Sequence, residues 1–210
     1  TLIADVCLVC LPSARKSTLL SAVSAARPKI ASYPFTTLQP NLGVVTIGFD
    51  TDFVLADLPG LIEGASKGAG LGYRFLRHVE RTRLLVHLID GAAKDPIGNY
   101  ETINRELAAF SPRLASKPQI VVVNKMDLPD AHEMWPLIQD AFAQKGIEPH
   151  RVSAATGEGL KTLVQIAAER LSELPQEMPT EEIEPEPIKD EKSFTISLSK
   201  SGWHVRGVAM

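Results

Sequence analysis

Two short segments of this chain carry residues suited to binding a nucleotide. The segment Asn124–Asp127 reads N-K-M-D after an apolar run, and Asp57–Gly60 reads D-L-P-G at the end of another. The carboxylate of Asp127 can accept two N–H donors from guanine, whereas adenine presents the wrong edge. An Asp that ends a buried strand, such as Asp57, can reach Mg²⁺ through water, and Gly60 can offer its N–H to a phosphate. Together these segments predict a guanine-nucleotide site.

A third segment, upstream, has the outline of a phosphate-binding loop without its glycines. Such loops read G-x-x-x-x-G-K-[ST]: backbone N–H groups surround a phosphate, the Lys reaches its oxygens and the hydroxyl binds Mg²⁺. Lys16 and Ser17 are in place, but Cys10 and Arg15 replace both glycines. A side chain at a positive-φ position costs roughly 1–2 kcal/mol, and two such positions would weaken affinity on the order of ten- to a thousand-fold. We expect weakened phosphate binding here; the alternative for this segment alone is an ordinary strand–turn–helix junction.

Two further segments complete the predicted site. The loop Phe35–Gln39 is placed to cover a γ-phosphate, with Thr37 supplying a hydroxyl to Mg²⁺. The segment Ser153–Ala155 could direct a backbone N–H at the guanine O6. The residues of the predicted nucleotide site are Cys10, Leu11, Pro12, Ser13, Ala14, Arg15, Lys16, Ser17, Phe35, Thr36, Thr37, Leu38, Gln39, Asp57, Leu58, Pro59, Gly60, Asn124, Lys125, Met126, Asp127, Ser153, Ala154 and Ala155.

The elements that position these segments alternate between two patterns. Short, continuously apolar runs are typical of strands buried on both faces of a largely parallel sheet; they are Ile3–Val9, Phe53–Ala56, Leu84–Ile89 and Ile120–Val123. Helical patterns lie between them, at Ser17–Ala25, Leu71–Thr82, Tyr100–Phe110, Met134–Lys145 and Leu160–Leu174. A predicted hairpin turn at Gly48–Asp52 follows Asn41–Ile47 and would make one edge strand antiparallel.

This alternation predicts a doubly wound α/β fold with helices on both faces of the sheet. In such folds ligands bind beyond the carboxyl ends of the strands. Asp57, Asp90 and Asn124 all fall at predicted strand ends. The order of the motifs and their placement therefore agree.

Composition limits the class of protein. The chain has 210 residues, of which 44% are hydrophobic and 22% charged, with a formal charge of −3. These values are typical of a globular protein, and the charge gives no case for non-specific nucleic-acid binding. No apolar run is long enough to span a membrane and no signal peptide is recognisable, so we expect a cytoplasmic protein. Cys7 and Cys10 form a C-x-x-C pair that would suit redox or metal chemistry, but no second pair accompanies them, and two small semi-buried side chains are the favoured interpretation.

The composition changes near the carboxyl end. Residues 175–192 are acidic and rich in proline, which indicates an extended linker between a nucleotide-binding domain over 1–174 and the start of another domain over 193–210. In the last segment, Phe194–Leu198 alternates like a strand. The chain begins inside one strand-like run and stops shortly after another starts, so we expect a piece of a longer protein.

Three stretches carry a family resemblance. Thr36–Gly43 (T-T-L-Q-P-N-L-G), Ala56–Ala65 (A-D-L-P-G-L-I-E-G-A) and Phe75–Thr82 (F-L-R-H-V-E-R-T) resemble the Obg (CgtA) family of ribosome-associated GTPases, over about 4–174. The resemblance implies a Ras-like P-loop NTPase fold and GTP hydrolysis with Mg²⁺. It also implies binding to the large ribosomal subunit during its assembly, and we expect a monomer.

The resemblance also implies roles for individual residues. Lys16 would contact the β/γ phosphates, and Ser17 and Thr37 would bind Mg²⁺, which Asp57 would hold through water. Gly60 would sense the γ-phosphate, so that Lys16, Thr37 and Gly60 are the predicted catalytic residues. Asn124 and Asp127 would read guanine, and GTP or GDP would be the bound nucleotide, with Ser153–Ala155 closing over the base.

The chain departs from the family at the phosphate loop. The family has glycine where this chain has Cys7, Cys10 and Arg15.

Leu61 stands where some GTPases carry a water-orienting Gln, so intrinsic hydrolysis should be slow. Two alternatives stay open: a nucleotide-poor scaffold that keeps the fold, favoured by Cys10 and Arg15, and an ATP-using relative, disfavoured by Asp127.

Overall fold

The computed structural model describes residues 4–12, 14–25, 29–30, 41–47, 51–57, 76, 79–175, 194–199 and 202–207. Contacts divide the chain into two compact units, Thr1–Met178 and Pro179–Met210. The second unit contains an antiparallel hairpin of β8 (Phe194–Ser199) and β9 (Gly202–Gly207). The strand predicted at Phe194–Leu198 is therefore present.

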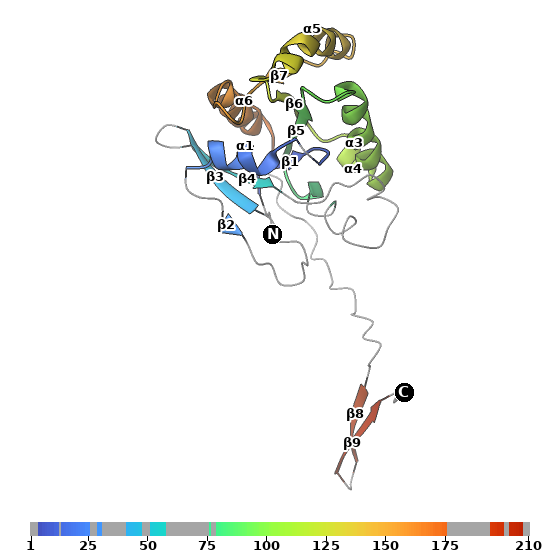
Figure 1. The fold of residues 1–210 in the computed structure, drawn as a ribbon. Helices are drawn as coiled ribbons and strands as arrows, with labels where there is room; N and C mark the ends of the chain where they lie inside the picture. Colours follow the sequence, from blue (N-terminus) through green and yellow to red (C-terminus); the bar gives the residue numbers. More distant parts are fainter. Residues whose placement is uncertain are drawn as a thin grey trace. The chain divides into compact units, whose positions relative to one another are not determined.

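The first unit contains a seven-stranded sheet in the order β2-β3-β4-β1-β5-β6-β7 (Figure 1). Its strands are β1 (Val6–Val9), β2 (Lys29–Ile30), β3 (Asn41–Ile47), β4 (Thr51–Asp57), β5 (Leu84–Asp90), β6 (Gln119–Asn124) and β7 (His150–Arg151). Neighbours from β4 to β7 are parallel, whereas β3 pairs antiparallel with both β4 and β2. The predicted fold class is confirmed, with one difference: β3 is antiparallel but is not the edge, because the two-residue β2 pairs with its outer side.

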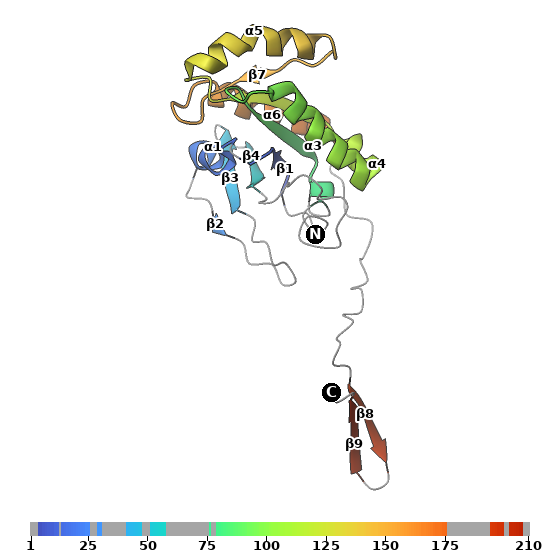
Figure 2. The same ribbon diagram turned by 45° about the vertical axis from the view of Figure 1, so that its right-hand side comes forward.

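The central strands are buried because helices cover both faces of the sheet. Along β1, Val6 and Leu8 pack into a core with α1 (Lys16–Val23) and α6 (Leu160–Glu173). Cys7 and Val9 face the opposite core, beneath α3 (Pro96–Phe110) and α4 (Pro112–Ala115). The same alternation places α5 (Pro129–Ala143) over the outer part of the sheet (Figure 2). The continuously apolar strands follow directly from this two-sided burial.

Two helices begin earlier than predicted, and one short helix was not predicted. α3 begins four residues earlier than the predicted Tyr100, because Asp95 caps its first turn by accepting the Gly98 N–H. α5 begins at Pro129 rather than Met134, since proline is well accommodated in a first turn. α4 was not predicted, as four residues carry no periodic signal. Of the helix predicted over 71–82, the structure describes residues 76 and 79–82, of which 76, 79 and 80 are helical.

The amino-terminal end of β5 is tied to the end of α6. Arg83, next to the first residue of β5, donates from Nη2 to the carbonyls of Leu171 and Leu174, both at 2.7 Å, and from Nε to Pro175 at 3.2 Å. Its Nη1 also lies 3.7 Å from Asp5 Oδ1. Arg83 therefore satisfies carbonyls that the end of a helix leaves unpaired. Within the described residues, no helix is long and apolar enough to cross a membrane.

Candidate functional site

In the turn between β1 and α1, one of the two positions that lack the expected glycine has a backbone conformation typical of glycine. Arg15 has φ 60° and ψ 47°, a left-handed conformation that glycine adopts without strain. The expectation of two positive-φ positions is wrong for Cys10, because the positive-φ non-glycine residues of the described chain are Arg15 and Lys125. Cys10 instead follows the last residue of β1 and is a buried side chain of the core. The strain cost of the lost glycines therefore falls on Arg15 alone.

The cysteines behave as apolar residues. Cys7 and Cys10 are free thiols and both are buried. Burial raises the pKa of Cys7 well above its ordinary value and raises that of Cys10 to about 11, with the Lys16 cation opposing the shift at both thiols. Neither thiol is therefore disposed to ionise, which a metal ligand or redox nucleophile requires.

The amino terminus of α1 has no side-chain cap from the residue that precedes it. That residue is Arg15, and the first turn carries no acidic residue. The N–H groups that begin a helix, together with its dipole, attract an anion. Ser17 lies exposed in this first turn, and Lys16 beside it is partly buried. The two residues that were predicted to touch phosphate and Mg²⁺ therefore stand at a helix start that Arg15 does not cap.

Asp57 carries a buried side-chain oxygen that is unsatisfied among the described residues. It ends β4 with only 5% of its surface exposed, and within the described part of the chain its Oδ1 has no hydrogen-bond partner. Its neighbour is Lys16, whose Nζ lies 3.9 Å from that oxygen. Burial raises the pKa of Asp57, while the Lys16 cation and a hydrogen bond from Asn41 oppose the rise. A buried carboxylate oxygen beside the Lys16 ammonium, without a donor among the described residues, fits a site for hydrated Mg²⁺.

The residues predicted to read the base are joined through Asn124 to the segment predicted to bind phosphate. This buried side chain donates from Nδ2 to the Ala14 carbonyl at 3.0 Å and accepts the Ala154 N–H on Oδ1 at 2.9 Å. Both ends of the amide are thus used. Three segments far apart in the sequence are held together by one side chain.

Asp127 lies exposed at the mouth of this arrangement. Ser153 donates from Oγ to Asp127 Oδ1 at 2.6 Å and accepts the Thr156 N–H at 3.1 Å. The hydrogen bond from Ser153 holds the pKa of Asp127 below its ordinary value. Asp127 is therefore kept ionised and oriented, as an acceptor for two N–H donors must be.

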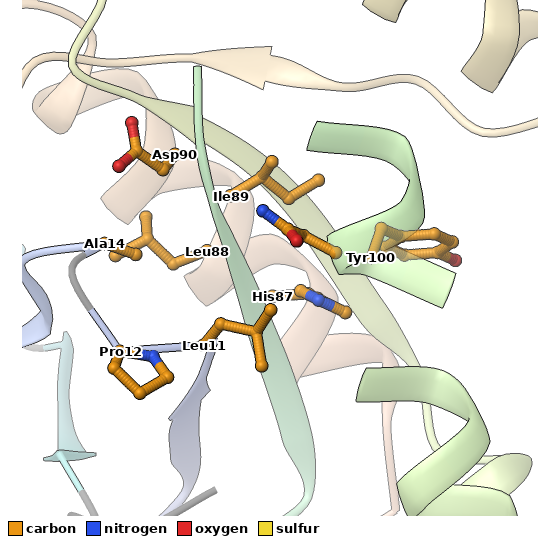
Figure 3. A pocket seen from close by; sticks show the side chains of 9 residues that line it. Leu11, Pro12, Ala14, His87, Leu88, Ile89, Asp90 and Tyr100 are labelled. Atoms are coloured by element: carbon orange, nitrogen blue, oxygen red, sulfur yellow. The ribbon is translucent and has the colours of Figure 1, made fainter. Parts of the chain in front are cut away.

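Lys125 connects this loop to β5. Its φ of 66° places it in the left-handed region, and its Nζ lies 2.5 Å from Asp90 Oδ2. Figure 3 shows the carboxylate of Asp90 turned away from His87 and Tyr100, near Ala14 of the phosphate loop. The Asp90 side chain was not predicted to belong to the site, although its position at a strand end was a signal for it.

Several predicted site residues lie outside the described part of the chain. These are Ser13, Phe35, Thr36, Thr37, Leu38, Gln39, Leu58, Pro59 and Gly60. The described ones lie at or just after the carboxyl ends of β1, β4, β6 and β7; they are Cys10–Pro12, Ala14–Ser17, Asp57, Asn124–Asp127 and Ser153–Ala155. The strand-end placement predicted for the ligand site therefore holds for every described segment.

A family model for 50S ribosome-binding GTPases matches residues 5–125, more than half of the chain. The chain belongs to this GTPase family. The resemblance to Obg proteins is confirmed as well. GTPase Obg of Roseiflexus castenholzii is 52% identical over 213 residues, covering 98% of this chain and 48% of the relative. GTPase Obg of Syntrophotalea carbinolica is 57% identical over 176 residues, covering 82% and 49%. The chain spans about half the length of the curated relatives it matches.

Solved structures agree with the fold. The G domain of the T. maritima FeoB iron transporter superposes with a TM-score of 0.61 at 21% identity, covering 80% of this chain and 97% of that one. A single-residue variant of Aquifex aeolicus Era bound to GDP·AlF4⁻ gives 0.60 at 20% identity, covering 97% and 77%. At these identities the likeness shows the fold alone. This Obg-type chain therefore has a P-loop GTPase fold.

Proposed function

We propose that this Obg-type chain binds GTP and GDP with Mg²⁺ and hydrolyses GTP slowly. The observation that carries the proposal is the Asn124 amide, which joins the phosphate loop to the segment that would contact the base. Asp127, ionised and held by Ser153, would accept the N1 and N2 hydrogens of guanine. The N–H groups at the start of α1 and the Lys16 ammonium would hold the phosphates. Base recognition and phosphate binding are therefore supported by connected parts of one site.

Mg²⁺ would neutralise charge that develops on the phosphates when it is bound. Ser17 and Thr37 are the residues proposed to ligate it. The unpartnered Oδ1 of Asp57 would accept a hydrogen bond from a water of its shell. Lys16, now near Asp57, would turn toward the β/γ oxygens, with Thr37 and Gly60 contacting the γ-phosphate. Lys16 and Mg²⁺ would stabilise the charge on the phosphates. Slow turnover is expected because Leu61 follows Gly60, and an aliphatic side chain cannot orient the attacking water.

We further propose that the protein acts as a switch in assembly of the large ribosomal subunit, as a cytoplasmic monomer. The family description names 50S ribosome binding, and the relatives are Obg GTPases. Loss of the γ-phosphate would release the segments around Thr37 and Gly60, which is how such switches change their surface. We propose the domain division 1–174, 175–192 and 193–210, with the ribosome-facing surface in the first of these.

An Asp127→Asn substitution tests guanine recognition. Xanthine carries a carbonyl where guanine carries its 2-amino group, and an Asn amide can donate to that carbonyl and still accept from N1. We expect GDP affinity to fall at least on the order of a hundredfold and xanthosine diphosphate affinity to rise. Asp130→Asn, in the first turn of α5, is the matched control and should change neither affinity. Equal affinities of the Asp127 variant and the control for GDP would refute the assignment.

The nucleotide-poor scaffold is the second candidate, and the left-handed Arg15 favours it. Titration of the nucleotide-stripped chain with fluorescent GDP and Mg²⁺, with ATP as competitor, separates the two. Micromolar or tighter binding that GTP displaces and ATP does not would support the GTPase. A folded sample that binds nothing near millimolar nucleotide would support the scaffold.

A further inference from the structure

The end of β5 is packed against the loop that follows β6. The register pairs Asp90 with Asn124, and the Gly91 N–H donates to the Asn124 carbonyl at 2.9 Å. A Cβ at Gly91 would stand 2.9 Å from that same carbonyl oxygen and from Cγ1 of Val123. This approach is closer than ordinary contacts allow, so only glycine fits here. The position of Asp90 is thereby fixed relative to the loop that begins at Asn124.

The carboxylate of Asp90 is fully used within this arrangement. Its Oδ1 accepts the Ala92 N–H at 3.1 Å, which orients the side chain, and its Oδ2 lies 2.5 Å from Nζ of Lys125. The two side chains are 12% and 21% exposed. A short, partly buried, charge-assisted contact of this kind is stronger than an ion pair in open solvent.

The partner of Asp90 is the strained residue of the base-reading loop. Lys125 holds φ 66°, a conformation that costs a non-glycine residue free energy and persists only where its surroundings enforce it. Its neighbours are held by backbone bonds from the Met126 N–H to the Val152 carbonyl and from the Leu128 N–H to the Lys125 carbonyl. Asp90 adds a side-chain anchor to the strained residue itself.

We propose that Asp90 is a positioning residue for guanine recognition: by holding the Lys125 ammonium, it keeps the loop from Asn124 to Asp127 in the conformation that presents Asp127 to the base. This inference rests on the proposed function. Asp90 itself does not touch the base in this account. Its charge acts through Lys125, and its removal leaves the phosphate loop, Lys16 and Asp57 in place.

The test uses Asp90→Asn, because an Asn side chain can still accept the Ala92 N–H while losing the charge that binds Lys125. Asp95→Asn is the matched control; it lies on the same connection, and Asn caps a helix as well as Asp does. We expect Asp90→Asn to weaken GDP affinity about tenfold. The rate at saturating GTP should be unchanged, and amide exchange at Met126 and Leu128 should rise in the nucleotide-free protein. The control should match the parent chain in all three.

A double-mutant cycle with Lys125→Met makes the route explicit. If Asp90 acts through the ammonium, adding Asp90→Asn to Lys125→Met causes no further loss of GDP affinity; full additivity overturns the proposal. Parent-like affinity and exchange in Asp90→Asn also overturn it, as does a loss of turnover with unchanged affinity. If the parent chain binds no GDP, the proposed function fails and this inference fails with it. If the parent chain and Asp90→Asn bind GDP with the same affinity, this inference alone is refuted.

Discussion

Asp57→Asn should stabilise the nucleotide-free protein. It should also abolish the gain in Tm that Mg²⁺ gives to the GDP-bound protein. In the free protein the buried Oδ1 has no hydrogen-bond donor among the residues that the structure describes, and leaving such a group unsatisfied costs about 1–3 kcal/mol. Lys16, at 3.9 Å, offsets part of this cost, but the pKa of Asp57 is still raised, so burial outweighs the attraction. Removing the charge should therefore raise the free energy of unfolding by about 1 kcal/mol at neutral pH, or Tm by about 2–4 °C.

The pH dependence follows from the direction of the shift. A carboxyl whose pKa is higher in the folded than in the unfolded state destabilises the fold only where it is ionised, so the cost is absent below its ordinary value of 3.8 and grows as the pH rises. The advantage of Asp57→Asn should thus be smaller near about pH 4.5 than near about pH 7.5. Thermal unfolding of the nucleotide-free variant at both pH values measures it.

Mg²⁺ supplies the second half of the assay. The parent chain with GDP should gain Tm when Mg²⁺ is added, because a ligand that binds only the folded state stabilises it, and Asp57→Asn should lose that gain. Asp52→Asn, an exposed position on the same strand, is the control and should behave as the parent does. A nucleotide-free Asp57 variant that melts several degrees below the parent at neutral pH would refute the reasoning.

Three further predictions concern strain, capping and burial. Arg15→Gly should raise the free energy of unfolding by about 0.5 kcal/mol, since relief of the left-handed strain exceeds the entropy cost of glycine. Cys10→Gly should lower it by about 1 kcal/mol, because the φ of Cys10 is not positive and its side chain is buried. Urea unfolding of both variants checks these opposite signs. Arg83→Ala should lower the free energy of unfolding by about 2 kcal/mol, because it leaves the carbonyls at the end of α6 unpaired. The ion pair of Arg170 with Glu173 is exposed, so Arg170→Ala should change the free energy of unfolding by less than about 0.5 kcal/mol in the same measurement. His87 is buried, and that burial lowers its pKa to about 4, so the free energy of unfolding should decline as the pH falls from 6.5 toward 4. His87→Leu should flatten this decline in acid titrations followed by circular dichroism. An unchanged profile in the variant would contradict the prediction.

The sequence predicted the elements whose signal is local. Buried parallel strands are continuously apolar, so β1, β4, β5 and β6 were located to within a few residues. The helix starts were less accurate, because Asp95 and Pro129 act through a single turn and precede the periodic pattern they begin. β2 and α4 are too short to carry any periodicity. Nothing in their composition distinguishes them from loops.

The sequence by itself determined which residue types could read guanine and hold phosphate, because Asp127, Lys16 and Ser17 have the required chemistry at the required spacing. It also located the altered phosphate loop. Only the tertiary structure decided what those alterations mean: the fold puts Arg15, and not Cys10, in the left-handed region. Backbone dihedral angles and partners across strands depend on contacts between segments distant in the chain. The Lys125–Asp90 contact joins residues 35 apart, and the Asn124–Ala14 bond joins residues 110 apart, so no local pattern could contain them.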